Sequence, residues 1–105
     1  MKPYKEAKTR LLLAALPDDA KSIAEFLELQ GVRGARGEAA SCALAVYLKR
    51  NGVPRIEVSQ HHGVWPAHGN NWEVGRSWQV PLSPACKDFV ERFDDGQYPR
   101  LVKGW

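Results

Sequence analysis

The stretch SCALAVYLKRNG, residues 41–52, decides how the rest of the chain is organised. Its leucines, alanines, valine and tyrosine predict a helix over residues 38–50 that is apolar around most of its circumference. Such a helix is normally central to a domain. The polar run Lys49-Arg50-Asn51-Gly52 marks where it ends. We therefore expect the remaining elements to pack around this helix.

Two helices are predicted ahead of it. The first covers residues 4–16, where apolar residues recur at helical spacing. These are Tyr4, Ala7, Leu11 and Ala15. The second covers residues 18–30, with two aspartates at its positive N-terminal end and Gly31 as its stop. The segment GVRGARG (31–37) that follows is interpreted as a flexible basic loop.

The clearest helix lies near the C-terminus. Ser83 suits the N-cap, Pro84 suits the first helical position, and Gly96 ends the pattern. Between them, one apolar stripe follows the spacing i, i+3, i+4 and i+7. Its members are Cys86, Phe89, Val90 and Phe93. This pattern predicts a helix that packs one side against the core.

Between the central helix and the C-terminal helix, the spacing of apolar residues changes from helical to alternating. RIEVSQ (55–60) reads as a half-buried strand, and further strands are predicted near 63–67 and 72–80, with HGNN (68–71) as the turn between them. We therefore predict an α+β fold, with three or four helices packed on a small three-stranded antiparallel meander. The whole chain, residues 1–105, is expected to form one domain, with residues 97–105 as an extended tail.

Composition narrows the class of protein. The chain has 105 residues, 44% hydrophobic and 26% charged, which is ordinary for a globular domain. It has no apolar run long enough to span a membrane, and LLLAAL (11–16) is shorter than the apolar region of a signal peptide. Its two cysteines do not form a disulfide framework. We expect a cytoplasmic protein that does not bind membranes.

The formal net charge of +3 is unevenly distributed along the chain. Residues 31–55 hold five cations against one carboxylate, Glu38, and could contact phosphates of nucleic acid. These cations are Arg33, Arg36, Lys49, Arg50 and Arg55. Residues 82–96 hold four carboxylates, and we expect an acidic end there. These are Asp88, Glu91, Asp94 and Asp95.

Cys42 is the strongest candidate for covalent chemistry. A thiol at a helix N-terminus has a lowered pKa, and a histidine from the following strand would complete the core of a cysteine hydrolase. The alternative is that Cys42 is a small buried hydrophobe, because free cysteine is among the most buried residue types. The apolar neighbours favour packing for Cys42, and the apolar stripe favours it more clearly for Cys86. We therefore predict no catalytic residue.

Three histidines, His61, His62 and His68, are the candidates for metal binding. Adjacent residues on a strand point to opposite faces, so His61 and His62 would not reach one ion together without an irregular turn. No second cluster of ligands accompanies them. We predict neither a metal site nor a cofactor.

Three pieces of the chain together carry a family resemblance. They are SCALAVYLKRNG (41–52), IEVS (56–59) with VPLSPACKDFVERFD (80–94), and DGQYPRL (95–101). In order, they resemble the pattern of a group of short uncharacterised proteins common in actinobacteria and their phages. The pattern is a cysteine with a small residue and an apolar-Tyr-Leu helix, a valine-rich strand, and a helix ending in Phe-Asp-x-Gly-x-Tyr-Pro.

This resemblance covers roughly the last two thirds of the chain and implies no particular activity. The chain departs from the group in two places. Ala43 stands where other members often have proline, and the connection over residues 61–78 is longer. That longer segment is where we expect this protein's own specificity.

The longer segment carries three of the four tryptophans. Tryptophan and arginine dominate the hot spots of protein interfaces. We therefore predict a partner-binding surface on the hairpin, formed by Trp65, Trp72, Arg76 and Trp78. The predicted function is a small non-enzymatic regulatory or inhibitory protein that binds a protein partner. The alternatives are weak, phosphate-dominated binding of nucleic acid and a hydrolase that uses Cys42.

Overall fold

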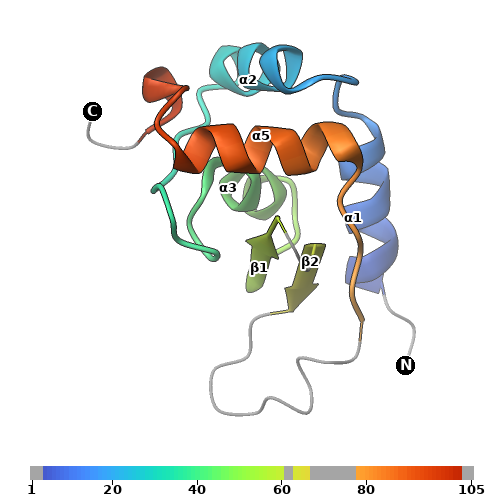
Figure 1. Cartoon of the computed structure of the whole chain (residues 1–105). Coiled ribbons are helices and arrows are strands. Elements are labelled where there is room, and N and C mark those ends of the chain that lie inside the picture. Colours follow the sequence, from blue (N-terminus) through green and yellow to red (C-terminus); the bar gives the residue numbers. More distant parts are fainter. Residues whose placement is uncertain (1–3, 61–62, 67–77, 103–105) are drawn as a thin grey trace.

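The computed structural model describes residues 4–60, 63–66 and 78–102 of the chain, which form an α+β fold (Figure 1). Its helices lie above and beside a small antiparallel hairpin. In chain order the elements are α1 (Tyr4–Ala14), α2 (Ala20–Leu29), α3 (Ala43–Arg50), β1 (Ile56–Ser59), β2 (Gly63–Pro66), α5 (Pro84–Asp94) and the 3₁₀ helix η1 (Pro99–Leu101).

Helix α3 lies at the centre, as its apolar sequence predicts. Leu44 and Leu48 have no exposed surface, and Tyr47 is buried apart from 2% of its surface. The hydroxyl of Tyr47 donates a 2.8 Å hydrogen bond to the carbonyl of Leu12, which ties α1 to α3. Strand β1 packs against α3, and α2 packs against α5. One contiguous apolar core therefore joins the helices and the hairpin.

The beginning of α3 differs from the prediction. The helix begins at Ala43 and not at residue 38, with Cys42 at its N-cap. The backbone before it forms bonds to other segments: the Ala39 carbonyl accepts from Val58 N–H and the Ser41 carbonyl from Ala35 N–H. These carbonyls hold the hairpin and the preceding loop in place. They are therefore not used in a helical ladder.

Helices α2 and α5 begin where capping chemistry places them. Asp19 is the N-cap of α2 and accepts a 2.8 Å hydrogen bond from Ser22 N–H. Ser83 is the N-cap of α5, its hydroxyl accepts from Cys86 N–H at 3.2 Å, and Pro84 follows it. Both caps satisfy N–H groups that have no partner inside the helix. The apolar stripe of α5 is buried, as its spacing predicts.

The hairpin confirms the first two predicted strands. Ile56 pairs with Pro66, Glu57 with Trp65, and Val58 with Val64. The side chains of Ile56, Val58 and Val64 are buried, whereas Glu57 and Trp65 are half-buried on the other face.

The predicted third strand is not seen in the described residues, where the sheet has two strands. Most of residues 72–80 lies outside them. Val80 forms a single antiparallel bridge to Val64, with two hydrogen bonds of 2.8 Å. One residue of the predicted strand is thus paired at the expected edge of β2.

The apolar face predicted for α1 is not the face that packs. Ala7 and Ala15 are exposed, and Leu11 keeps 73% of its surface exposed. The core instead receives Thr9, which is fully buried, and Leu16. Helix α1 has apolar residues on both sides, so its sequence spacing alone did not identify the packing face.

The prediction of an extended C-terminal tail was also wrong for residues 97–102. Leu101 is buried to within 1% of its surface, and η1 packs against α2. Tyr98 stacks on Phe89 with ring centroids 5.4 Å apart. Val102 bridges in parallel to Gly34. The apolar side chains of this segment complete the core between α2 and α5, and that burial orders it.

The role of this segment in stability can be tested with a matched pair of substitutions. Leu101→Ala should lower the free energy of unfolding by about 3 kcal/mol, because it leaves a cavity in a closed core. Leu29→Ala removes the same atoms from a side chain that is 88% exposed. This substitution should change the free energy of unfolding by less than about 0.5 kcal/mol. Urea unfolding of both variants measures the difference. Equal effects would contradict the packed tail.

Candidate functional site

Cys42 is part of the core, as predicted. It is 3% exposed, and burial raises the pKa of its thiol above the ordinary value. The N–H groups of Ala45 and Leu44, at the start of α3, lower that pKa, but the effect of burial is larger. The negative charge of Asp94 raises it further. The thiolate that a nucleophile requires is therefore disfavoured at this position.

Cys86 has a similar environment. It is 2% exposed, both cysteines are free thiols, and burial raises the pKa of Cys86 as well. Its N–H is held by the Ser83 cap. Both thiols are enclosed in the core and protonated at neutral pH.

The structure describes part of the predicted tryptophan surface. Trp65 lies on the outer face of β2, opposite Glu57. Trp78 is half-buried and packs against the core. Trp72 and Arg76 lie outside the described residues. Trp65 is thus the described tryptophan whose strand position faces away from the core.

The five cations of residues 31–55 do not form one surface. Arg33, Lys49 and Arg50 line one open groove of about 540 Å³. Arg36 turns away, and its Nε donates to the Asp94 carbonyl at 3.0 Å. Arg55 is exposed in the turn before β1, with a φ of 56°. The tertiary structure therefore brings three of the five predicted cations together in one groove.

The groove lies between the loop that follows α2 and the exposed side of α3. Its other walls come from small residues and one acid, Glu38, for which sequence reasoning gave no role. The small residues are Gly31, Gly34, Ala35, Ala40 and Ser41, and Val46 also contributes. Arg50 Nη1 donates to the Gln30 carbonyl at 3.0 Å, and Lys49 Nζ donates to the Ala40 carbonyl. Two cations are thus held in place by backbone oxygens.

The loop expected to be flexible is anchored at several points. Gly34 N–H donates to the Leu101 carbonyl at 2.8 Å, and Ala35 N–H donates to the Ser41 carbonyl at 2.7 Å. Gly37 N–H donates to Asp94 Oδ1 at 2.8 Å. Because these bonds hold the loop to α3, α5 and the tail, Arg33 projects from a fixed backbone.

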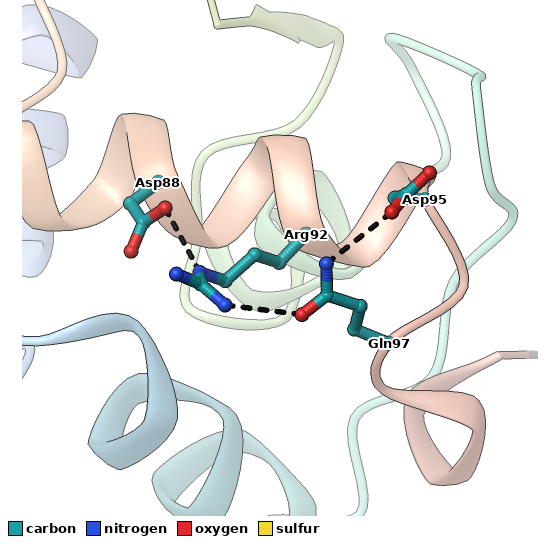
Figure 2. A network of polar contacts seen from close by, with 4 residues as sticks. All are labelled: Asp88, Arg92, Asp95 and Gln97. Atoms are coloured by element: carbon teal, nitrogen blue, oxygen red, sulfur yellow. Dashed lines mark hydrogen bonds and ion pairs between the residues drawn. The ribbon is translucent and has the colours of Figure 1, made fainter.

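The predicted acidic end is an interaction network within the protein. Figure 2 shows Arg92 between Asp88 of α5 and Gln97, which in turn contacts Asp95 just after the helix. Its Nε donates to Asp88 Oδ1 at 2.9 Å and its Nη1 donates to Gln97 Oε1 at 3.1 Å. Gln97 Nε2 in turn donates to Asp95 Oδ2 at 3.2 Å. Local contacts at the end of α5 therefore account for Asp88 and Asp95.

The described residues contain no group of three or more histidine, cysteine, aspartate or glutamate side chains placed to hold a metal ion. His61, His62 and His68 lie outside them. Across residues 4–60, 63–66 and 78–102, no helix combines the length and apolar content that crossing a membrane requires.

Comparison with protein-family models, with curated proteins and with solved structures finds no significant match to this chain. The resemblance to short actinobacterial and phage proteins therefore stays a prediction from the sequence. The function has to be argued from the surface of the structure.

The burial of the cysteines predicts their reactivity. Iodoacetamide should label both thiols slowly in the native protein, because each is enclosed and has a raised pKa. Labelling should become fast on addition of denaturant, which serves as the control. Rapid native labelling at Cys42, followed by mass spectrometry, would contradict its place in the core and support the hydrolase alternative.

The anchoring of the loop predicts an unequal effect of two glycine substitutions. A Cβ at Gly34 would lie less than 3.0 Å from backbone atoms of Ser41, Cys42 and Ala43, so Gly34→Ala should cost about 3 kcal/mol of unfolding free energy. A Cβ at Gly37 would meet nothing within 4 Å. Gly37→Ala should cost only about 1 kcal/mol, from its left-handed backbone. Thermal and urea unfolding measure both, and equal costs would show that the loop is not seated on α3.

Proposed function

We propose that this protein is a non-catalytic binding protein of regulatory or inhibitory kind, which engages a protein partner through the outer face of the β1–β2 hairpin. The proposal includes a cytoplasmic location, which two free thiols suit. Trp65 is its central residue. Trp72 and Arg76 belong to the same predicted surface.

The observation that carries the proposal is the side of the sheet on which Trp65 lies. The neighbouring Val64 has no exposed surface, and β2 alternates, so Trp65 points away from the core. A tryptophan on the outer face of a short hairpin is not needed to seal the inner one. Large aromatic residues at such positions supply much of the binding energy of protein interfaces.

The hydrogen bonds at the edges of the hairpin also favour the outer face as the binding surface. Strand β1 is bonded at its free edge, where Val58 N–H donates to the Ala39 carbonyl at 2.9 Å. Strand β2 is bonded at its own edge through Val64 and Val80. A partner strand would have to displace these bonds in order to extend the sheet. A partner that docks on the outer face, where Trp65 and Glu57 are half-buried, would leave these bonds in place.

The hydrolase alternative lacks comparable support. Cys42 lines a small cavity of about 220 Å³ with Ser59 and Gln60, but its own exposed fraction is only 3%. A buried thiol with a raised pKa is suited to packing. We therefore do not propose catalysis.

The proposal predicts a selective loss of binding. After nuclease treatment, the tagged protein is used to capture its partner from a lysate of the native cell, and the purified partner is titrated by calorimetry. Trp65→Ala should weaken binding by at least about 2 kcal/mol, because it truncates the central aromatic contact. Leu29→Ala, which truncates an exposed apolar side chain away from the hairpin, is the control and should bind like the wild type.

Thermal melts distinguish a binding defect from unfolding. The melting temperature of Trp65→Ala should stay within a few degrees of the wild-type value, as for most surface substitutions. Equal affinities of wild type and Trp65→Ala would contradict the proposed surface. A partner captured only from a parallel lysate without nuclease would contradict a protein partner.

A further inference from the structure

A second surface of this protein, separate from the hairpin face, has the chemistry of an anion site. It is the groove between loop residues 31–35 and the exposed side of α3. Its lining holds three cations, Arg33, Lys49 and Arg50, and one carboxylate, Glu38, which gives a net charge of +2 by subtraction. The whole chain has a net charge of +3. An excess of positive charge is therefore concentrated in one concave surface.

Two of these cations have a structural explanation, which has to be weighed first. Lys49 and Arg50 lie in the last turn of α3, where positive charge is favourable, and both donate to backbone carbonyls. Those bonds use one donor of each side chain. A lysine has three donors and an arginine has five. The same bonds hold both side chains at the groove, with further donors left for a ligand.

Arg33 has no such explanation. It is exposed, it lies outside any helix, and no hydrogen bond or ion pair joins its side chain to the described part of the chain. Its neighbours fix its position, because Val32 is buried and Gly34 is bonded to the tail. The backbone that carries Arg33 is thus fixed on the loop side of the groove, whereas Lys49 and Arg50 belong to α3 on the other side. Such an arrangement reduces the ordering cost of binding an anion.

We propose that this groove binds phosphoryl groups. Arginine and lysine together recognise phosphate, arginine through its planar fork and lysine as a point charge. The groove is larger than one phosphate requires, and Ala35, Ala40 and Val46 offer apolar contact to an attached sugar. Among the described residues that line it there is no aromatic side chain to stack on a base. The ligand is therefore a phosphate ester, bound without base preference.

Two sources share this chemistry, the backbone of a nucleic acid and a free phosphate or nucleotide. Inorganic phosphate is titrated first while amide NMR signals are followed, with chloride at equal ionic strength as the control. Signals of residues 31–35 and 49–50 should shift with a Kd of about 1 mM or lower. A single-stranded oligothymidylate is then titrated by fluorescence anisotropy at several salt concentrations. If three cations contact its backbone, the slope of log K against log salt should be about −2.

The matched variants are Arg33→Gln and Arg55→Gln. Each removes one charge from an exposed arginine, but only Arg33 lies in the groove. Arg33→Gln should weaken phosphate binding about tenfold or more, as loss of a charged hydrogen bond does, and should reduce the salt slope by about 0.7. Arg55→Gln should leave both nearly unchanged. Both variants should keep the wild-type melting temperature.

Each outcome of these experiments either supports or overturns the phosphate-binding proposal. NMR shifts in the groove with phosphate, together with a salt-dependent rise in oligothymidylate anisotropy, support binding to a nucleic-acid backbone. Shifts with phosphate and no change in anisotropy support a free phosphate ester. No shift with phosphate, or shifts that chloride reproduces, would overturn the proposal. Equal weakening by Arg33→Gln and Arg55→Gln would also overturn it, because attraction by net charge alone would then explain the binding.

Discussion

Gly34 lies against the first turn of α3 with no room for a side chain, because a Cβ there would come within 3.0 Å of backbone atoms of Ser41, Cys42 and Ala43. Its N–H is bonded to the Leu101 carbonyl, and Val102 bridges to it in parallel. One backbone contact thus joins the loop after α2, the central helix and the C-terminal segment. If this approach were prevented, the loop would leave α3, and the tail would lose the backbone partner that positions it beside α2.

The positions of the charges follow from this contact. Once Gly34 is seated, Arg33 faces outward beside α3, whereas Arg36 comes next to α5 and bonds to the Asp94 carbonyl. Asp94 also accepts from Gly37 N–H, so an acid of α5 anchors a basic loop. Two arginines three positions apart therefore have different roles. One is held in an internal contact and the other is directed to solvent at the groove.

The two surfaces considered for binding differ in what the fold contributes. At the hairpin, alternation alone places Trp65 outward once Val64 is buried. At the groove, no local rule brings Arg33 near Lys49 and Arg50. Their meeting depends on the path of the loop across α3, which the Gly34 contact fixes. The first surface is a property of a strand, and the second is a property of the tertiary structure.

The sequence by itself determined the elements whose signals are local. The central helix, the cap at Ser83 and the buried stripe of α5 follow from apolar spacing and from N–H groups that need a partner within one turn. The alternation of Ile56 and Val58 likewise identified β1 and its inner face. The burial of Cys42 followed from its apolar neighbours. In each case the responsible atoms lie within a few residues of one another.

Tertiary structure alone decided the features that depend on distant partners. It made α3 begin only at Ala43, because the carbonyls of Ala39 and Ser41 bond to the hairpin and the loop and not within a helix. It selected which apolar side of α1 packs, and it ordered the tail through Leu101. A backbone carbonyl or an apolar side chain is recognisable in the sequence, but its partner is not, since contacts between remote segments depend on how the whole core is filled.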